Sequence, residues 1–181
     1  MAPESQSTER SATPSSSTHP QDKVAVRGNR GVKVVRSCTV RKPASELYQF
    51  WRSLENLPRV VQHPMSINRL SDTESHWKVS APAIGFVEWD AVIINDHPNE
   101  LIAWRSKQGA IVPNAGSVRF EPAKGEEGTE VTVQVEYDAP GGKVTAYLAK
   151  LTGEEPEQQI AGALWRFKAL METGEIPKWE R

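Results

Sequence analysis

Glu88 and Asp90, two carboxylates separated by one residue, are the candidates that the sequence offers for a general acid and a general base. They lie in residues 85–95, where apolar and polar positions alternate as in a β-strand. Successive side chains of a strand point to opposite faces, so both carboxylates lie opposite the more apolar set. We therefore predict that the carboxylates face solvent. The apolar set, which faces inward, comprises Val87, Trp89, Ala91 and Ile93.

The histidines and the single cysteine do not form a pattern typical of a metal site or a nucleophile. His63, His76 and His97 lack the close spacing of zinc ligands. Cys38 lies in an expected strand without an adjacent basic residue, which favours a buried, inert thiol. The glycine-rich turns lack both the Lys-Ser/Thr of a P-loop and the order of a dinucleotide-binding loop. We expect no metal and no cofactor.

The aromatic residues give a stronger indication, because they occur in every segment expected to border an interior space. Two interpretations stay open at this point. Large aromatic side chains fill the cores of most proteins, and they also line pockets for flat or isoprenoid ligands. The residues concerned are Tyr48, Trp51, Trp77, Phe86, Trp89, Trp104, Tyr137, Tyr147, Trp165 and Phe167.

Composition excludes several other classes of function. The chain has 181 residues, with 22 Lys and Arg against 23 Asp and Glu, and a net charge of −1. This balance gives no general attraction for nucleic acid. No apolar run approaches the roughly 20 residues that cross a bilayer, so we expect no integral membrane segment. Transient membrane contact and the oligomeric state stay open.

The chain begins with a segment that we expect to be disordered. Its first 20 residues contain six Ser, three Thr and three Pro, and none of Val, Leu, Ile, Phe, Tyr or Trp. Such a segment buries too little apolar surface to offset its ordering entropy. It also lacks the apolar stretch of a secretory signal. We predict a tail over residues 1–31, a single domain over residues 32–177 and a cytoplasmic location.

The domain begins with a strand followed by two short helices. A period of two over residues 34–40 predicts the strand. From Pro43 onward, apolar residues recur three or four positions apart, which predicts a helix, and a second short helix is expected over residues 55–61. Six further strands are predicted over residues 66–70, 76–80, 85–95, 101–106, 117–121 and 130–138, separated by turn-forming residues that include a turn over residues 114–116.

A long helix over residues 155–173 ends the domain, with an apolar stripe that includes Ile160, Leu164 and Phe167. At 1.5 Å per residue it is about 28 Å long, comparable with the longest strand, so it can lie along the sheet. The predicted fold is α+β, a helix-grip in which a curved antiparallel sheet of about seven strands wraps around this helix. Residues 142–152 form either a lid over the cavity mouth or a kinked packing helix.

Five segments carry a resemblance to a known group of proteins. They are ELYQFWRSLENLPR at 46–59, VEWDA at 87–91, PNELIAWRS at 98–106, NAGSVRF at 114–120 and GTEV at 128–131. The chain from about residue 32 to residue 177 resembles the polyketide cyclase/dehydrase and coenzyme-Q-binding START-type group of the SRPBCC superfamily, which has a Bet v 1-like helix-grip fold. The resemblance implies a ligand that is a lipid, a quinone or a polyketide-like ring system.

Our leading hypothesis is a binding or carrier domain for a hydrophobic small molecule, held between the sheet and the terminal helix. The alternative is an enzyme of the polyketide cyclase, aromatase or dehydrase type that uses the same cavity, and whether the protein has any turnover stays open. An enzyme would need inward-facing acids and bases, which the strand alternation does not supply. The cavity candidates are Trp51, Trp77, Val87, Trp89, Ile93, Trp104, Phe120, Tyr137, Leu164 and Phe167.

Overall fold

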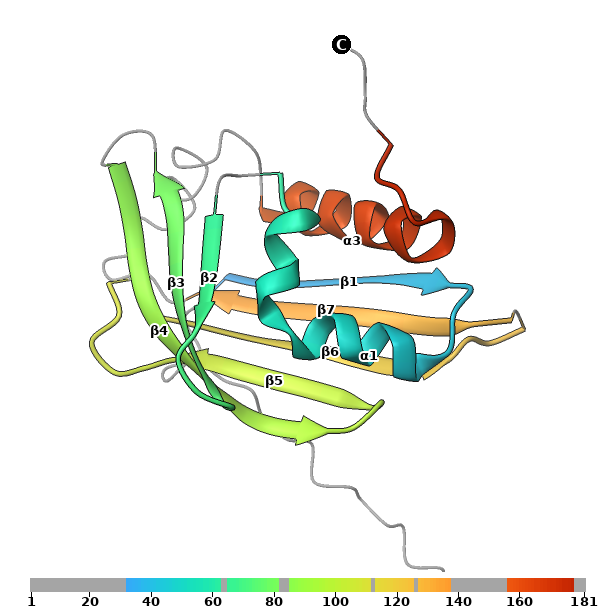
Figure 1. The fold of residues 1–181 in the computed structure, drawn as a ribbon, viewed down its shortest axis with the longest axis horizontal. Helices are drawn as coiled ribbons and strands as arrows, with labels where there is room; N and C mark the ends of the chain where they lie inside the picture. Colours follow the sequence, from blue (N-terminus) through green and yellow to red (C-terminus); the bar gives the residue numbers. More distant parts are fainter. Residues whose placement is uncertain are drawn as a thin grey trace, which may run out of the picture.

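The fold is built on one antiparallel sheet of seven strands in the order β1-β7-β6-β5-β4-β3-β2 (Figure 1). The computed structural model describes residues 32–62, 65–81, 85–111, 113–125, 127–137 and 156–177. The predicted tail and the predicted helical stretch over 142–152 lie outside these residues. The strands are β1 (Val32–Val40), β2 (Met65–Arg69), β3 (Glu74–Ala81), β4 (Gly85–His97), β5 (Leu101–Ser106), β6 (Asn114–Pro122) and β7 (Thr129–Tyr137).

Each predicted strand is present, and the largest difference is at the start of β6. A turn is predicted over residues 114–116, whereas the structure begins the strand at Asn114. Both neighbouring strands pair with this segment: Asn114 lies opposite Tyr137, and Gly116 lies opposite both Val135 and Trp104. The small and polar residues there are typical of a turn, but pairing on both sides outweighs that local preference.

The two short helices after β1 are α1 (Ala44–Arg52) and the 3-10 helix η1 (Leu54–Arg59). Pro43 precedes α1 with an extended backbone, a position where its missing N–H group costs no hydrogen bond. Leu47, Phe50 and Trp51 form the buried face of α1. This face packs over β5 and β6, in line with the three- and four-residue spacing of its apolar side chains.

The terminal helix α3 (Pro156–Thr173) runs alongside β1, on the side of the sheet that also carries α1 (Figure 1). Phe167 is fully buried, with its ring centroid 5.1 Å from that of Phe50 and 5.6 Å from that of Trp51. The Tyr48 ring packs edge-on against Phe120 of β6. The two helices are therefore joined to each other and to the sheet through aromatic rings, and the helix-grip prediction is confirmed.

Glu172 fastens the end of α3 to the segment that follows β1. Its carboxylate accepts hydrogen bonds from the Arg41 backbone N–H at 2.8 Å and from the Lys168 ammonium at 2.9 Å. The Arg41 N–H is the largest of the effects that hold the pKa of Glu172 below its ordinary value of 4.5. The folded state therefore favours the charged carboxylate.

Replacing this carboxylate should change how stability depends on pH. A carboxyl group with a lowered pKa stabilises the folded state above its unfolded pKa, and this contribution is lost as the pH falls through the folded value. We expect Glu172→Gln to lower the free energy of unfolding by about 1 kcal/mol at pH 7, and the difference to vanish in acid. Urea denaturation at a series of pH values measures this difference. A loss in the free energy of unfolding that is the same at every pH would contradict the role assigned to the charged Glu172 carboxylate.

Candidate ligand cavity

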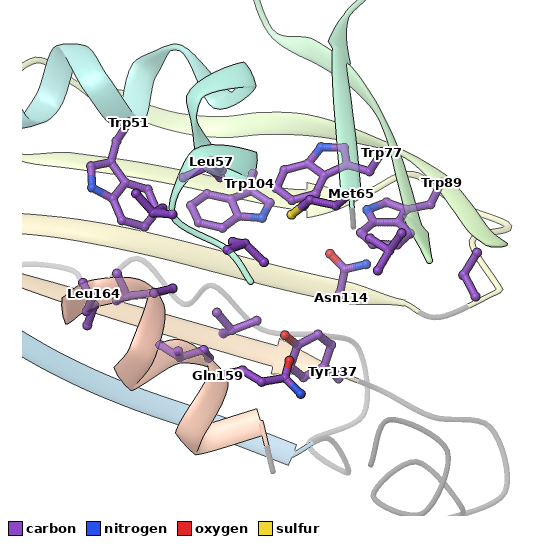
Figure 2. A pocket seen from close by; sticks show the side chains of 18 of the residues that line it. Trp51, Leu57, Met65, Trp77, Trp89, Trp104, Asn114, Tyr137, Gln159 and Leu164 are labelled. Atoms are coloured by element: carbon purple, nitrogen blue, oxygen red, sulfur yellow. The ribbon is translucent and has the colours of Figure 1, made fainter. Parts of the chain in front are cut away.

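A cavity of about 220 Å³ lies between the sheet and the first half of α3 (Figure 2). Strands β3 to β7 form most of its wall, while α1, η1 and the segment leading into β2 close it from one side. Its lining consists of Trp51, Leu57, Val60, Val61, Met65, Trp77, Val79, Ser80, Val87, Trp89, Trp104, Asn114, Val133, Val135, Tyr137, Gln159, Ile160, Ala163 and Leu164.

Three tryptophans from adjacent strands form one wall of the cavity. Trp77 of β3 and Trp89 of β4 lie directly opposite each other in the sheet, with ring centroids 5.7 Å apart and planes inclined by 21°. Trp104 of β5 stacks on Trp77 at 6.4 Å and 19°. Cross-strand neighbours on one face come close enough for aromatic rings to interact, so the register places Trp77 beside Trp89. Trp104 lies opposite Ile93 in the register, and its ring reaches Trp77 across β4.

Gly116 provides the space that Trp104 occupies. A Cβ atom at Gly116 would lie 2.4 Å from Cζ2 and 2.7 Å from Cε2 of the Trp104 ring, well inside van der Waals contact. A glycine inside a strand often marks such a close approach. This role of Gly116 was not predicted, because the small and polar residues around it are typical of a turn.

Three polar side chains of the cavity, those of Asn114, Tyr137 and Gln159, lie toward one end, where β6 begins and β7 ends. Asn114 and Tyr137 are opposite each other in the register, and Asn114 is buried. Figure 2 shows Asn114 beside Trp89 and the Gln159 amide beside Tyr137, while Trp51 and Leu57 lie toward the other end. Burial raises the pKa of Tyr137 to about 12, so its hydroxyl is neutral at pH 7. None of the described lining residues carries a charge.

Seven of the ten predicted cavity residues line this space: Trp51, Trp77, Val87, Trp89, Trp104, Tyr137 and Leu164. The structure does not bring Ile93, Phe120 and Phe167 to the cavity lining. The rings of Phe120 and Phe167 pack against side chains of α1, which fills that part of the interior. Ile93 lies at a β-bulge and borders a separate small hollow beside Arg52.

Most of the lining residues that were not predicted fall into two groups. One is η1 with the segment after it, which contributes Leu57, Val60 and Val61. Their relation to the sheet depends on the tertiary path of the chain, and no spacing in the sequence reports it. The other is α3 and β7, whose apolar periodicity was evident and could have identified their inward faces. The apolar residues concerned there are Val133, Val135, Ile160 and Ala163, whereas the polar Gln159 of α3 carries no such signal.

Glu88 and Asp90 lie on the outer face of the sheet, as predicted. Glu88 forms an ion pair with Lys78 at 2.7 Å, and Asp90 contacts the His76 ring at 2.8 Å. Lys78 is the main reason that the pKa of the Glu88 carboxyl is lowered. Neither carboxylate lines the cavity, so this pair cannot act on a molecule bound there.

Cys38 has the environment of an inert thiol. Its sulfur lies 3.9 Å from the Leu164 carbonyl oxygen, and burial is the main cause that raises its pKa to about 11. Within the described part of the chain, no three His, Cys, Asp or Glu residues are grouped so that they could hold a metal ion. In the same residues, no helix is both long and apolar enough to cross a membrane.

Comparisons with known proteins agree with this architecture. The family model described as "Polyketide cyclase / dehydrase and lipid transport" matches residues 40–164. An uncharacterized 17.2 kDa protein from the melC2-rnhH intergenic region of Streptomyces lincolnensis is 30% identical over 140 residues, which are 77% of this chain and 89% of that protein.

Two solved structures illustrate the range of similarity. The crystal structure of DR_A0006 from Deinococcus radiodurans is 40% identical, with a TM-score of 0.67 over 80% of this chain and 99% of that one. The Zhui aromatase/cyclase from Streptomyces sp. R1128 is 13% identical, with a TM-score of 0.56 over 80% of this chain and 98% of that one. The second likeness concerns the fold alone.

Proposed function

This chain belongs to the polyketide cyclase / dehydrase and lipid transport family, and on that premise we propose that it binds a hydrophobic small molecule in the cavity between its sheet and α3. The observation that carries the proposal is the cavity of about 220 Å³, with a described lining of aromatic and aliphatic side chains and a few neutral polar groups. Protein interiors contain few voids larger than a water molecule, so a cavity of this size indicates a binding site for a small molecule.

Burial of apolar surface supplies the driving force. At roughly 25 cal/mol per Å², about 300 Å² of ligand surface removed from water contributes about 7 kcal/mol before the cost of association. The tryptophan wall of Trp77, Trp89 and Trp104 offers aromatic surface to such a ligand. No group in the lining has to react for this function.

The described lining favours binding over catalysis. A cyclase or dehydrase of the same shape would need a group that takes up a proton near neutral pH. Tyr137 is the titratable side chain in the described lining, and burial raises its pKa to about 12, away from the range useful for a base. The expected cytoplasmic location stays a prediction, and transient membrane contact stays open.

Native mass spectrometry of the protein purified from cells tests the proposal directly. The intact protein is weighed, then denatured, and any released molecule is identified. We expect one hydrophobic molecule per chain. An empty protein that also fails to bind N-phenylnaphthylamine, a neutral probe that fluoresces in apolar surroundings, would contradict a binding function. A bound molecule that is converted into a different product during incubation would instead support an enzyme.

A larger side chain that fills the cavity should block ligand binding. Ala163 lines the cavity from α3, whereas Ala161 on the same helix is exposed to solvent. We expect Ala163→Phe to weaken N-phenylnaphthylamine binding at least tenfold, because the new ring occupies the space that the probe needs. Ala161→Phe, the same change on the outer side of the helix, should bind the probe as the unaltered protein does. Fluorescence titration measures both, and equal affinities for the two variants would place the probe elsewhere.

A further inference from the structure

The polar end of the cavity points to the chemistry of the ligand. Resting on the proposed binding function, we propose that the ligand is neutral and carries a carbonyl-type oxygen that accepts a hydrogen bond from the Tyr137 hydroxyl. Its apolar body would extend from there toward Trp51 and Leu57 at the other end (Figure 2).

The Tyr137 hydroxyl is a hydrogen-bond donor that has no acceptor among the described side chains. It lines the cavity, and it makes no hydrogen bond to any side chain in the described part of the protein. Figure 2 shows this hydroxyl directed toward the interior space, with Asn114 on the neighbouring strand close by. A donor in an apolar site that is left unpaired costs free energy, and a ligand oxygen would remove that cost.

A second donor lies in the same wall. The Trp89 indole nitrogen is buried and has no hydrogen-bond partner among the described residues, whereas that of Trp77 donates to Ser75 Oγ at 2.9 Å. The Trp51 indole nitrogen, toward the other end of the cavity, is likewise buried without a partner in the described part of the chain, so the end at Tyr137 is distinguished by two donors, the Trp89 N–H and the Tyr137 hydroxyl. A carbonyl oxygen has two lone pairs and no hydrogen to donate, so it can accept hydrogen bonds from these two donors.

The absence of charge among the described lining residues favours a neutral ligand. A carboxylate or phosphate brought into this end would lose its hydration and meet no cation from the described residues. The Tyr137 hydroxyl, whose pKa is about 12, is neutral, so it could offer such an anion a hydrogen bond but no opposite charge. Fatty-acid and phospholipid headgroups are therefore poorer occupants of this end than a ketone, a quinone or an ester.

Three probes of similar shape test the inference through quenching of the intrinsic tryptophan fluorescence. Acetylnaphthalene carries a carbonyl oxygen, isopropylnaphthalene replaces it with a methyl group, and naphthoate carries a charge. We expect Tyr137→Phe to weaken acetylnaphthalene binding about tenfold, the value of one hydrogen bond, and to leave isopropylnaphthalene binding unchanged. Naphthoate should bind the unaltered protein at least tenfold more weakly than acetylnaphthalene.

Tyr48→Phe is the matched control, because the Tyr48 hydroxyl is already donated to Asp96 Oδ1 at 2.6 Å and does not line the cavity. It should change the affinity for neither neutral probe. Equal effects of Tyr137→Phe on the two neutral probes would overturn the assigned hydrogen bond while leaving the binding function intact. Naphthoate binding as tight as that of acetylnaphthalene would overturn neutrality, and this comparison requires no variant. Failure of all three probes to bind would count against the proposed function itself.

Discussion

Gly116→Ala is expected to remove most of the affinity for N-phenylnaphthylamine and to destabilise the fold by about 1–3 kcal/mol, the usual cost of overpacking. A methyl group at residue 116 would lie 2.4 Å from the Trp104 ring, so the indole has to move. β6 is held by hydrogen-bonded neighbours on both sides, so the strand has little freedom to retreat. The Trp104 ring lines the cavity, and its displacement would reduce the space that the probe needs. Fluorescence titration and urea denaturation measure the two effects.

A double variant separates this clash from a general effect of alanine in the strand. The atom that comes closest to Gly116 is Cζ2 of the Trp104 indole, an outer atom of its six-membered ring that has no counterpart in the smaller side chain of phenylalanine. We expect Gly116→Ala combined with Trp104→Phe to be more stable than the sum of the two single effects predicts, by about 1 kcal/mol or more. Strictly additive effects would show that residues 104 and 116 do not constrain each other.

The architecture could be predicted because the information for it is local. Alternation in residues 131–137 identified β7, and the apolar stripe of residues 160–171 identified α3. The start of β6 could not be predicted in the same way. Asn114 and Gly116 have low intrinsic strand preference, and only pairing with β5 and β7 makes them part of a strand.

The cavity was harder to predict than the sheet, because inward-facing residues divide between a packed core and an open space. Trp104 and Phe120 are both buried and both lie on inward faces, yet only Trp104 lines the cavity. The difference is α1, whose Tyr48 ring covers Phe120. Which part of a sheet a helix covers depends on how it docks, and the alternation of residues along a strand carries no information about that.

Phe167→Ala should be the most destabilising of the substitutions considered, with an expected loss of about 3–5 kcal/mol in the free energy of unfolding. Phe167 is fully buried, and its ring contacts Phe50 and Trp51 of α1. Deleting the ring leaves a void between the two helices that share the inner side of the sheet, and the surrounding side chains collapse only in part. Urea denaturation gives the loss directly.

Phe86→Ala deletes the same ring from a site where 58% of the side chain is exposed, so it is the matched control. The Lys78 ammonium lies 4.5 Å from the Phe86 ring centroid, a contact worth about 0.5–1 kcal/mol at an exposed site. We therefore expect this variant to lose no more than about 1 kcal/mol. A similar loss in both variants would mean that Phe167 does not join α3 to α1. A large difference would support the contribution of the buried Phe167 ring to the packing of α3 against α1.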